Sequence, residues 1–213
     1  MSYDLVYREH SDYFGAEPQQ ILLDYYHLLD KSKPVLDIGA GQGRHALFLA
    51  RQGFSVDAIE PSKMAVESLQ SAAAKEKLPI RAYHSRFQDF VAEPGSYSGI
   101  LLFGVIQELG WESIHLLLDK VRLWCSKGGL IFVTGFTIED PSFAEMSQEE
   151  QIGKNSFRDE DGNIHTYLEP NEILELFDRC RLVHHWEGLG PLHKHGDGPE
   201  HRHGSVRAVF WKR

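Results

Sequence analysis

The chain of 213 residues has 42% hydrophobic, 25% charged and 11% aromatic residues, which is typical of one globular domain and excludes a disordered protein. Its net charge is -9 and no dense stripe of Lys and Arg follows a predicted helix, so we expect no affinity for nucleic acid or membranes. Cys125 and Cys180 do not suggest a disulfide framework, and the N-terminus lacks the apolar run of a signal peptide. We expect a cytoplasmic protein, monomer or homodimer, in which residues 1–213 form a single domain.

Helices and short apolar strands alternate along the first two thirds of the chain. Apolar residues recur at helical spacing over 17–30, with Pro18 in the first turn, and residues 1–30 are expected to form an N-terminal lid and helix. The elements that follow are strands at 34–38, 55–59, 80–84, 99–103 and 130–134 and helices at 44–52, 62–77 and 113–124. This alternation predicts an α/β fold with a Rossmann-like, doubly wound and mostly parallel sheet.

The last third of the chain has a different character. Residues 136–169 are polar and interrupted by Pro and Gly, which is typical of a long functional excursion, so we expect an insertion near the substrate site. A short helix at 171–178 and strands at 182–187 and 205–212 follow. The two strands are expected to form an antiparallel C-terminal hairpin on the edge of the sheet.

The first strand runs directly into the loop Gly39-Ala40-Gly41-Gln42-Gly43, where the absence of side chains lets the backbone approach a ligand closely. A dinucleotide site requires a third glycine where Arg44 stands, and a phosphate-binding loop requires Lys followed by Ser or Thr. Asp37 before the loop favours a positively charged ligand group. Glu60, at the end of the next strand, can accept hydrogen bonds from a ribose. The expected ligand therefore has a ribose and a positive end.

These features resemble the class I S-adenosylmethionine-dependent methyltransferases through VLDIGAGQG, VDAIEPS and GILLFGVIQEL, over roughly residues 30–135. The resemblance implies S-adenosylmethionine as cofactor, with its amino group near Asp37 and its ribose on Glu60. Pro61 and Met64 would flank the adenine, and a backbone N–H of Arg86 or Phe87 would replace the acidic adenine contact of many members. The implied cofactor site comprises Asp37, Gly39, Ala40, Gly41, Gly43, Arg44, Glu60, Pro61, Met64, Arg86, Phe87, Phe103 and Gly104.

The whole-chain layout looks like the tellurite-resistance (TehB-like) methyltransferases. The matching segments are Tyr13-Phe14, GQGRHALFLA and EGLGPLHK. In that group a His followed by a basic residue, with an arginine further on, is associated with the substrate oxyanion. The resemblance implies that His193, Lys194 and a later arginine, Arg207 or Arg202, bind a small acceptor. That acceptor would be a metalloid oxyanion such as tellurite or selenite, or a thiol, which needs no strong base.

Six of the 12 histidines, His184, His185, His193, His195, His201 and His203, fall within residues 184–203. Imidazoles suit zinc or nickel, but a His-x-His pair on a loop points its rings apart unless the loop forms strands. The hypotheses are a solvated polar loop, a substrate-binding role for His193, and a bound metal, and we expect no metal. The competing hypothesis for the whole chain is a non-catalytic regulatory protein of this fold that binds S-adenosylmethionine or a metal.

Four N-terminal aromatic residues have two interpretations. Tyr3, Tyr7, Tyr13 and Phe14 form either a lid over the sulfonium, which the face of an aromatic ring attracts, or a hydrophobic anchor for the first helix.

Overall fold

Five parallel strands form the centre of the protein in a computed structural model that describes residues 3–10, 12–194 and 198–213, without the side chains of Tyr3 and Leu5. They are β1 (Val35–Ile38), β2 (Val56–Glu60), β3 (Ile80–His84), β4 (Tyr97–Leu102) and β5 (Cys125–Thr137), in the spatial order β3-β2-β1-β4-β5. Because the chain crosses from β3 over β1 to β4, the order reverses between β1 and β4. Ligands of doubly wound sheets bind at such a switch point, beyond the carboxyl ends of the strands.

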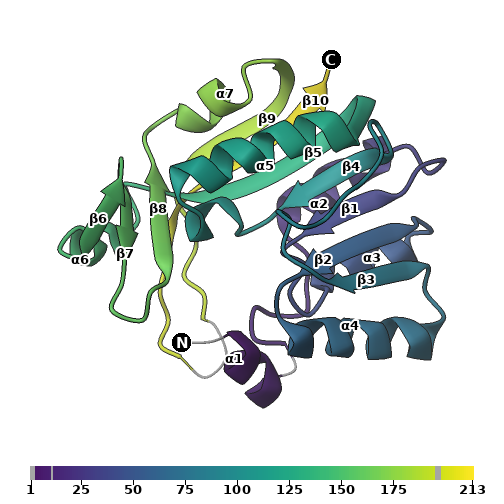
Figure 1. Cartoon of the computed structure of the whole chain (residues 1–213), viewed down its shortest axis with the longest axis horizontal. Coiled ribbons are helices and arrows are strands. Elements are labelled where there is room, and N and C mark those ends of the chain that lie inside the picture. The colour runs from purple at the N-terminus through teal and green to yellow at the C-terminus, as the bar shows by residue number, and fades with distance from the viewer. Residues whose placement is uncertain (1–2, 11, 195–197) are drawn as a thin grey trace.

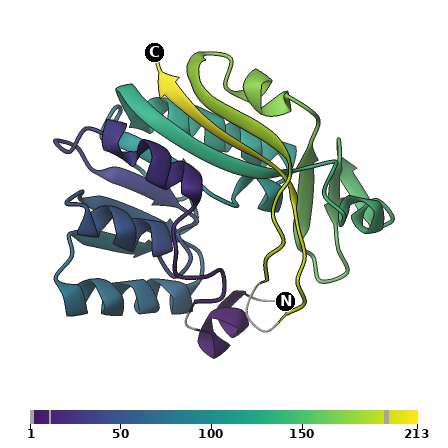
Figure 2. The same ribbon diagram turned by 180° about the vertical axis from the view of Figure 1, so that it is seen from behind.

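Helices cover both faces of this sheet (Figures 1 and 2). One face packs against α2 (Gln20–Tyr25), α3 (Arg44–Arg51) and α4 (Lys63–Glu76), and the other against α5 (Trp111–Trp124) and α7 (Glu172–Leu176). The cause is the alternation of side chains along each strand. In β1, Val35 joins the core under α2 and α3, whereas Leu36 joins the core under α5. The predicted doubly wound architecture is confirmed.

The C-terminal hairpin closes the sheet as expected. β9 (Cys180–Leu189) pairs antiparallel with β10 (Gly204–Lys212), and β10 pairs antiparallel with β5 from Ser205↔Phe136 to Trp211↔Leu130. The two strands are longer than predicted, and the chain extends away from the sheet after β9 ends and before β10 begins. Their connection therefore reaches past the carboxyl ends of the parallel strands.

Residues 136–169 are more ordered than their composition suggests. They contain α6 (Phe143–Met146), β6 (Glu150–Gly153), β7 (Ser156–Arg158) and β8 (Ile164–Leu168). β4 ends at Leu102, opposite Val133, and β8 takes its place beside β5 by pairing with Phe136 and Thr137. The strand predicted at 130–134 therefore extends to Thr137 at one end, and at the other it begins at Cys125, which pairs with Tyr97 of β4.

The N-terminal region also differs from the prediction. The helix expected over 17–30 begins at Gln20, because Gln19 is in an extended conformation (φ -60°, ψ 138°), and it tightens into a 3₁₀ turn, η1 (Tyr26–Leu28). A further helix, α1 (Tyr3–Glu9), was not predicted and packs on α4. Another 3₁₀ turn, η2 (Ile106–Glu108), follows β4. Within the described ranges, no helix has the length and apolar character needed to cross a bilayer.

Candidate functional site

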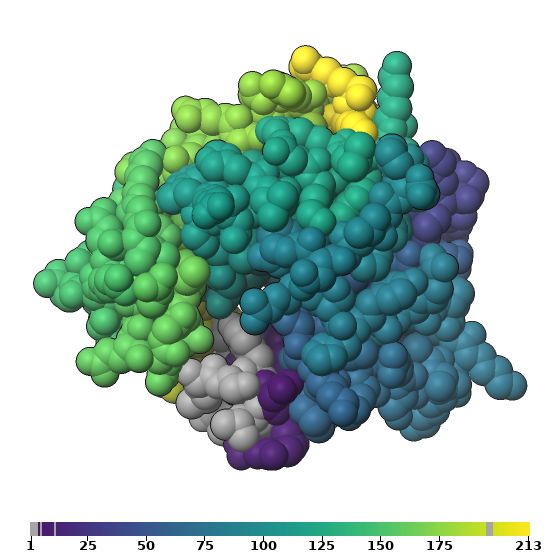
Figure 3. All heavy atoms as spheres, viewed as in Figure 1, coloured from purple at the N-terminus to yellow at the C-terminus, as the bar shows by residue number. Residues whose placement is uncertain are grey.

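A cavity of about 1570 Å³ lies at the switch point of the sheet. The glycine loop, the N-terminal segment, the 136–169 insertion and the β9–β10 connection each contribute to its wall. Figure 3 shows a hollow on this face between the teal and green parts of the surface, next to the purple N-terminal helix. Small-molecule sites commonly occupy about 300–1000 Å³, so the cavity has room for a cofactor and an acceptor together.

Most of the predicted site residues meet in this one cavity. It is lined by Gly39, Ala40, Gly41, Gly43, Arg44, Glu60, Pro61, Arg86, Phe87, Phe103 and Gly104, and also by His193, Lys194 and Arg207. Two predicted cofactor residues are not among the lining residues. Asp37 is buried beneath the glycine loop, and Met64 is half-buried in the first turn of α4. Arg202, the alternative to Arg207, does not line the cavity.

The glycine loop requires its glycines for two different reasons. Gly41 and Gly43 have φ of 54° and 88°, in the left-handed region that residues with a side chain rarely adopt. A Cβ on Gly41 would point toward the cavity, 3.1 Å from the hydroxyl of Tyr7, whereas one on Gly43 would lie 2.3 Å from a methyl of Leu69. Gly41 therefore keeps the ligand side open, and Gly43 lets α3 and α4 pack closely.

Asp37 is a buried carboxylate with spare hydrogen-bonding capacity. Its side chain accepts a hydrogen bond from the backbone N–H of Ala46 in α3, while Oδ2 has no partner among the described residues. Burial, reinforced by the negative charge of Glu60, raises the pKa of Asp37 to about 7 against the opposing effect of Arg44. A buried unpaired carboxylate oxygen is costly, so this one fits a cationic ligand group such as the amino group of S-adenosylmethionine.

Glu60 is held in a fixed orientation at the end of β2. Its Oε2 accepts from the Gly41 N–H at 2.9 Å and its Oε1 from the Ser62 N–H at 2.9 Å. Burial raises its pKa, although these two backbone hydrogen bonds oppose the shift. Each carboxylate oxygen accepts two hydrogen bonds, so both can still receive one from a ribose hydroxyl.

The N-terminal segment is attached to the glycine loop by hydrogen bonds. Gln42 donates to the His10 carbonyl at 2.6 Å and accepts from the Tyr13 N–H at 3.2 Å. Arg44 donates to the Phe14 carbonyl. Thus the residue that replaces the third glycine of a dinucleotide site secures this segment over the loop.

The attached segment places aromatic rings on the cavity wall. Tyr7, Tyr13 and Phe14 line the cavity and meet edge to face, with ring centroids 4.9 Å apart for the last two. This position favours the lid interpretation over a simple anchor for the first helix. The side chain of Tyr3 lies outside what the structure describes.

The wall that faces the glycine loop is basic. His193, Lys194 and Arg207 lie on it, and among its described lining residues between 190 and 207 there is no carboxylate. The Arg207 guanidinium packs over the ring of Trp186, 4.8 Å from the ring centroid, which restricts its motion. A wall of this charge suits an anionic acceptor.

The buried carboxylate of Asp140 is hydrogen-bonded to the residues of this wall. Asp140 accepts hydrogen bonds from His203 Nδ1 at 2.9 Å and from the Gly204 N–H at 3.0 Å. Burial acts to raise the pKa of Asp140, but the hydrogen bonds from His203 and Ser142 outweigh it and lower the pKa. Asp140 is therefore a fixed negative charge next to His203.

The six clustered histidines separate into two groups. His184 pairs with the Tyr25 hydroxyl at 3.2 Å and His185 with Glu187 at 3.0 Å, both on β9. His193, His201 and His203 lie together on the β9–β10 connection, and His195 lies outside the described residues.

Two features of the site were not predicted from the sequence. They are the hydrogen bonds by which Gln42 holds the N-terminal segment and those by which Asp140 holds His203 and Gly204. Gln42 stands inside the motif, but its partners are backbone atoms about 30 residues away, which no local pattern indicates. Asp140 stands in a segment classified as a polar excursion. Its one local signal is the turn it forms with Ser142, whose N–H donates to Asp140 Oδ1 at 2.9 Å.

Part of the chain matches a known family. Residues 35–129, which include the glycine loop and Glu60, match the family model described as a methyltransferase domain. A curated protein, hemagglutinin 1 of Eikenella corrodens, is 51% identical over 47 residues, which are 22% of this chain. That match spans only 16% of the hemagglutinin.

Solved structures with this fold can be aligned with nearly the whole chain. TehB from Haemophilus influenzae matches with a TM-score of 0.73 and 19% identity over 92% of this chain, which spans 63% of the TehB chain. A SAM-dependent methyltransferase from Methanosarcina mazei matches with a TM-score of 0.73 and 16% identity, over 92% of this chain and 98% of that one.

A third solved structure holds two bound molecules. The 1,6-didemethyltoxoflavin-N1-methyltransferase of Burkholderia thailandensis, with 1,6-didemethyltoxoflavin and S-adenosylhomocysteine bound, matches with a TM-score of 0.66 and 17% identity, over 91% of this chain and 75% of that one. All three matches cover at least 91% of this chain, so they extend beyond the 35–129 segment.

Proposed function

We propose that this chain, a class I S-adenosylmethionine-dependent methyltransferase in its fold and its domain family, methylates a small anionic or thiolate acceptor held against the β9–β10 connection. The observation that carries the proposal is the shared cavity. The glycine loop and Glu60 form one side, while His193, Lys194 and Arg207 form the other. Tellurite, selenite and small thiolates are the acceptors that fit this charge.

The cofactor side of the cavity offers a partner for each polar end of S-adenosylmethionine. Asp37 Oδ2 would pair with the amino group, and Glu60 would accept from the ribose hydroxyls. The bound cofactor supplies an activated methyl group, which an acceptor takes by in-line displacement. The residues of this chain then have to hold the acceptor in line and exclude water.

The acceptor side supplies charge and orientation. Lys194 and Arg207 would neutralise a developing or existing negative charge, and His193 would take a proton from an acceptor that carries one. The rings of Tyr7, Tyr13 and Phe14 would cover the sulfonium and keep water out. No strong general base is needed, because an oxyanion or a thiolate already carries the attacking lone pair.

Release of S-adenosylhomocysteine tests the proposal when the chain is incubated with S-adenosylmethionine and tellurite, selenite or a small thiol in turn. We expect turnover with at least one of them. Replacing Arg207 by Gln should raise the acceptor KM by at least about 10-fold, because a charge-assisted hydrogen bond is lost. His193→Ala should lower turnover with nearly unchanged cofactor affinity.

Arg202→Gln is the matched control, since Arg202 precedes β10, is exposed and does not line the cavity. Its kinetics should equal those of the unmodified chain. Tight cofactor binding without turnover on any acceptor would instead support a regulatory protein of this fold.

A further inference from the structure

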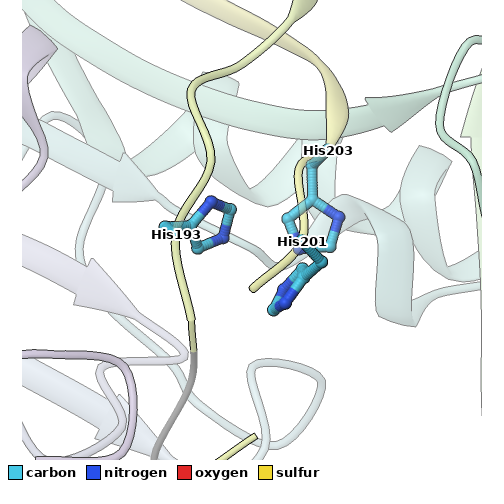
Figure 4. A group of neighbouring side chains, drawn as sticks. All are labelled: His193, His201 and His203. Carbon is cyan, nitrogen blue, oxygen red and sulfur yellow. The ribbon is translucent and has the colours of Figure 1, made fainter. Parts of the chain in front are cut away.

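Strand pairing brings three histidines onto one face of the β9–β10 connection. The backbones of His193 and His201 form two reciprocal hydrogen bonds of 2.8 Å in an antiparallel bridge. Residues opposite each other in such a bridge share a face, and so does His203, two residues further along. The ring centroids are 4.7, 4.9 and 5.2 Å apart, and the rings converge in Figure 4.

Each of these rings is held in the tautomer that binds metals. His193 Nδ1 lies 3.1 Å from the Pro191 carbonyl, and His201 Nδ1 lies 3.0 Å from the Pro199 carbonyl. His203 Nδ1 lies 2.9 Å from the Asp140 carboxylate. Because a carbonyl or an ionised carboxylate only accepts, each Nδ1 carries the hydrogen and each Nε2 the lone pair. Outer partners of this kind orient metal-binding histidines.

The spacing of the three rings suits a small ion. One ring nitrogen of each histidine lies within 4.8 Å of those of the other two. In a tetrahedral site with zinc–nitrogen bonds of about 2.0–2.1 Å, the nitrogens are about 3.4 Å apart. Shifts of about 1 Å per ring, through side-chain rotation, would therefore close the cluster around an ion.

We propose that His193, His201 and His203 bind one divalent transition-metal ion through Nε2, with zinc as the leading candidate. Three imidazoles select zinc, nickel, copper or iron over magnesium and calcium. The described residues supply three protein ligands, which is the number found in many catalytic zinc sites. The metal site is inferred from the geometry of the three histidines, and the inference does not depend on methyl transfer.

The position of the cluster suggests a use for the bound ion. His193 and His203 line the large cavity, while His201 does not. Resting on the proposed function, the ion would hold the anionic atom of the acceptor on the basic wall beside Arg207. With the ion bound, His193 would act on the acceptor through the ion and would no longer take a proton from it.

Cobalt binding tests the site directly. The full chain without an affinity tag, stripped of metal with EDTA, is titrated with Co²⁺, and the visible absorption of four-coordinate cobalt is recorded. We expect one Co²⁺ per chain, displaced by Zn²⁺. His201→Ala should weaken Co²⁺ binding by more than the roughly 10–100-fold that loss of an outer partner costs, and Asp140→Asn by an amount within that range.

His27→Ala is the matched control, because His27 is exposed on η1 and takes no part in the cluster. It should leave the cobalt spectrum unchanged, and thermal unfolding should verify that each variant is folded. Equal Co²⁺ binding by the unmodified chain and folded His201→Ala would overturn the site. Metal binding without methyl transfer would support the metal site and contradict only the proposed function. Methyl transfer that is unaffected by EDTA and by His201→Ala would overturn the proposal that the ion holds the acceptor.

Discussion

The two sides of the cavity are built in different ways. The cofactor side stands on the ends of β1 and β2, where buried parallel strands fix the backbone of the glycine loop and Glu60. The acceptor side has two parts: Arg207 lies in β10 between β5 and β9, whereas His193 and Lys194 lie on a connection that extends beyond the sheet, where a short bridge joins His193 and His201. Residues on the cofactor side and Arg207 are therefore positioned by the sheet. His193 and Lys194 depend on the bridge, so the two sides should respond separately to mutation.

The largest effect on the cofactor side is expected from Asp37→Asn. The variant removes the negative charge that we propose pairs with the amino group of S-adenosylmethionine, and it should weaken cofactor binding roughly 10–150-fold, the equivalent of one charge-assisted hydrogen bond. Isothermal titration calorimetry measures the affinity. The acceptor KM, measured at saturating cofactor, should change little if the two sides are separate.

Asp57→Asn provides the control for that experiment. Asp57 is a buried carboxylate on the neighbouring strand β2, but it bonds Arg81 and the Tyr97 hydroxyl rather than facing the cavity. This variant should lose thermal stability and keep its cofactor affinity. Similar losses of affinity in both variants would mean that Asp37 acts only through folding.

A smaller effect is expected from pH. The pKa of Asp37 is about 7 in the folded chain, against an ordinary value of 3.8. Cofactor binding favours the ionised form, so affinity should rise about 10-fold between pH 6 and pH 8. Calorimetry at several pH values checks this, and the Asp37→Asn variant should lack this part of the dependence.

The same raised pKa has the opposite sign for folding without cofactor. Above pH 3.8 the unfolded chain ionises Asp37, while the folded chain resists ionisation until about pH 7, so stability falls as the pH rises across this window. Asp37→Asn removes the penalty. The cofactor-free variant should thus unfold at a higher temperature than the unmodified chain at pH 8, and a lower one would contradict the assignment.

The smallest effect is expected on the acceptor side from Trp186→Leu. The ring of Trp186 positions the Arg207 guanidinium, and a cation–π contact of about 0.5–2 kcal/mol corresponds to a roughly 2–30-fold rise in acceptor KM. Steady-state kinetics with the preferred acceptor measures it. Trp211→Leu is the control, since Arg181 packs over Trp211 at 5.5 Å, at the other end of the hairpin.

How well each region could be predicted from the sequence depends on whether local patterns determine its structure. The alternation of strands and helices and the loop from Gly39 to Gly43 are local patterns, so the fold and most of the cofactor side could be predicted. The position of β8 beside the far end of β5 could not, because it depends on where β4 ends. The convergence of His193, His201 and His203 could not either, because it requires the antiparallel bridge to form first.

The hydrogen bonds that attach the N-terminal segment to Gln42 and Arg44 have a consequence for sequence variation. Gln42 and Arg44 donate to the backbone carbonyls of His10 and Phe14, and Gln42 accepts from the backbone N–H of Tyr13. Every residue other than proline offers these backbone groups, so the three hydrogen bonds do not depend on which side chains stand at these positions. Tyr13 and Phe14, whose rings line the cavity, can therefore be exchanged to reshape its roof for a different acceptor while the hydrogen bonds are retained, which makes them a natural starting point for redesigning specificity.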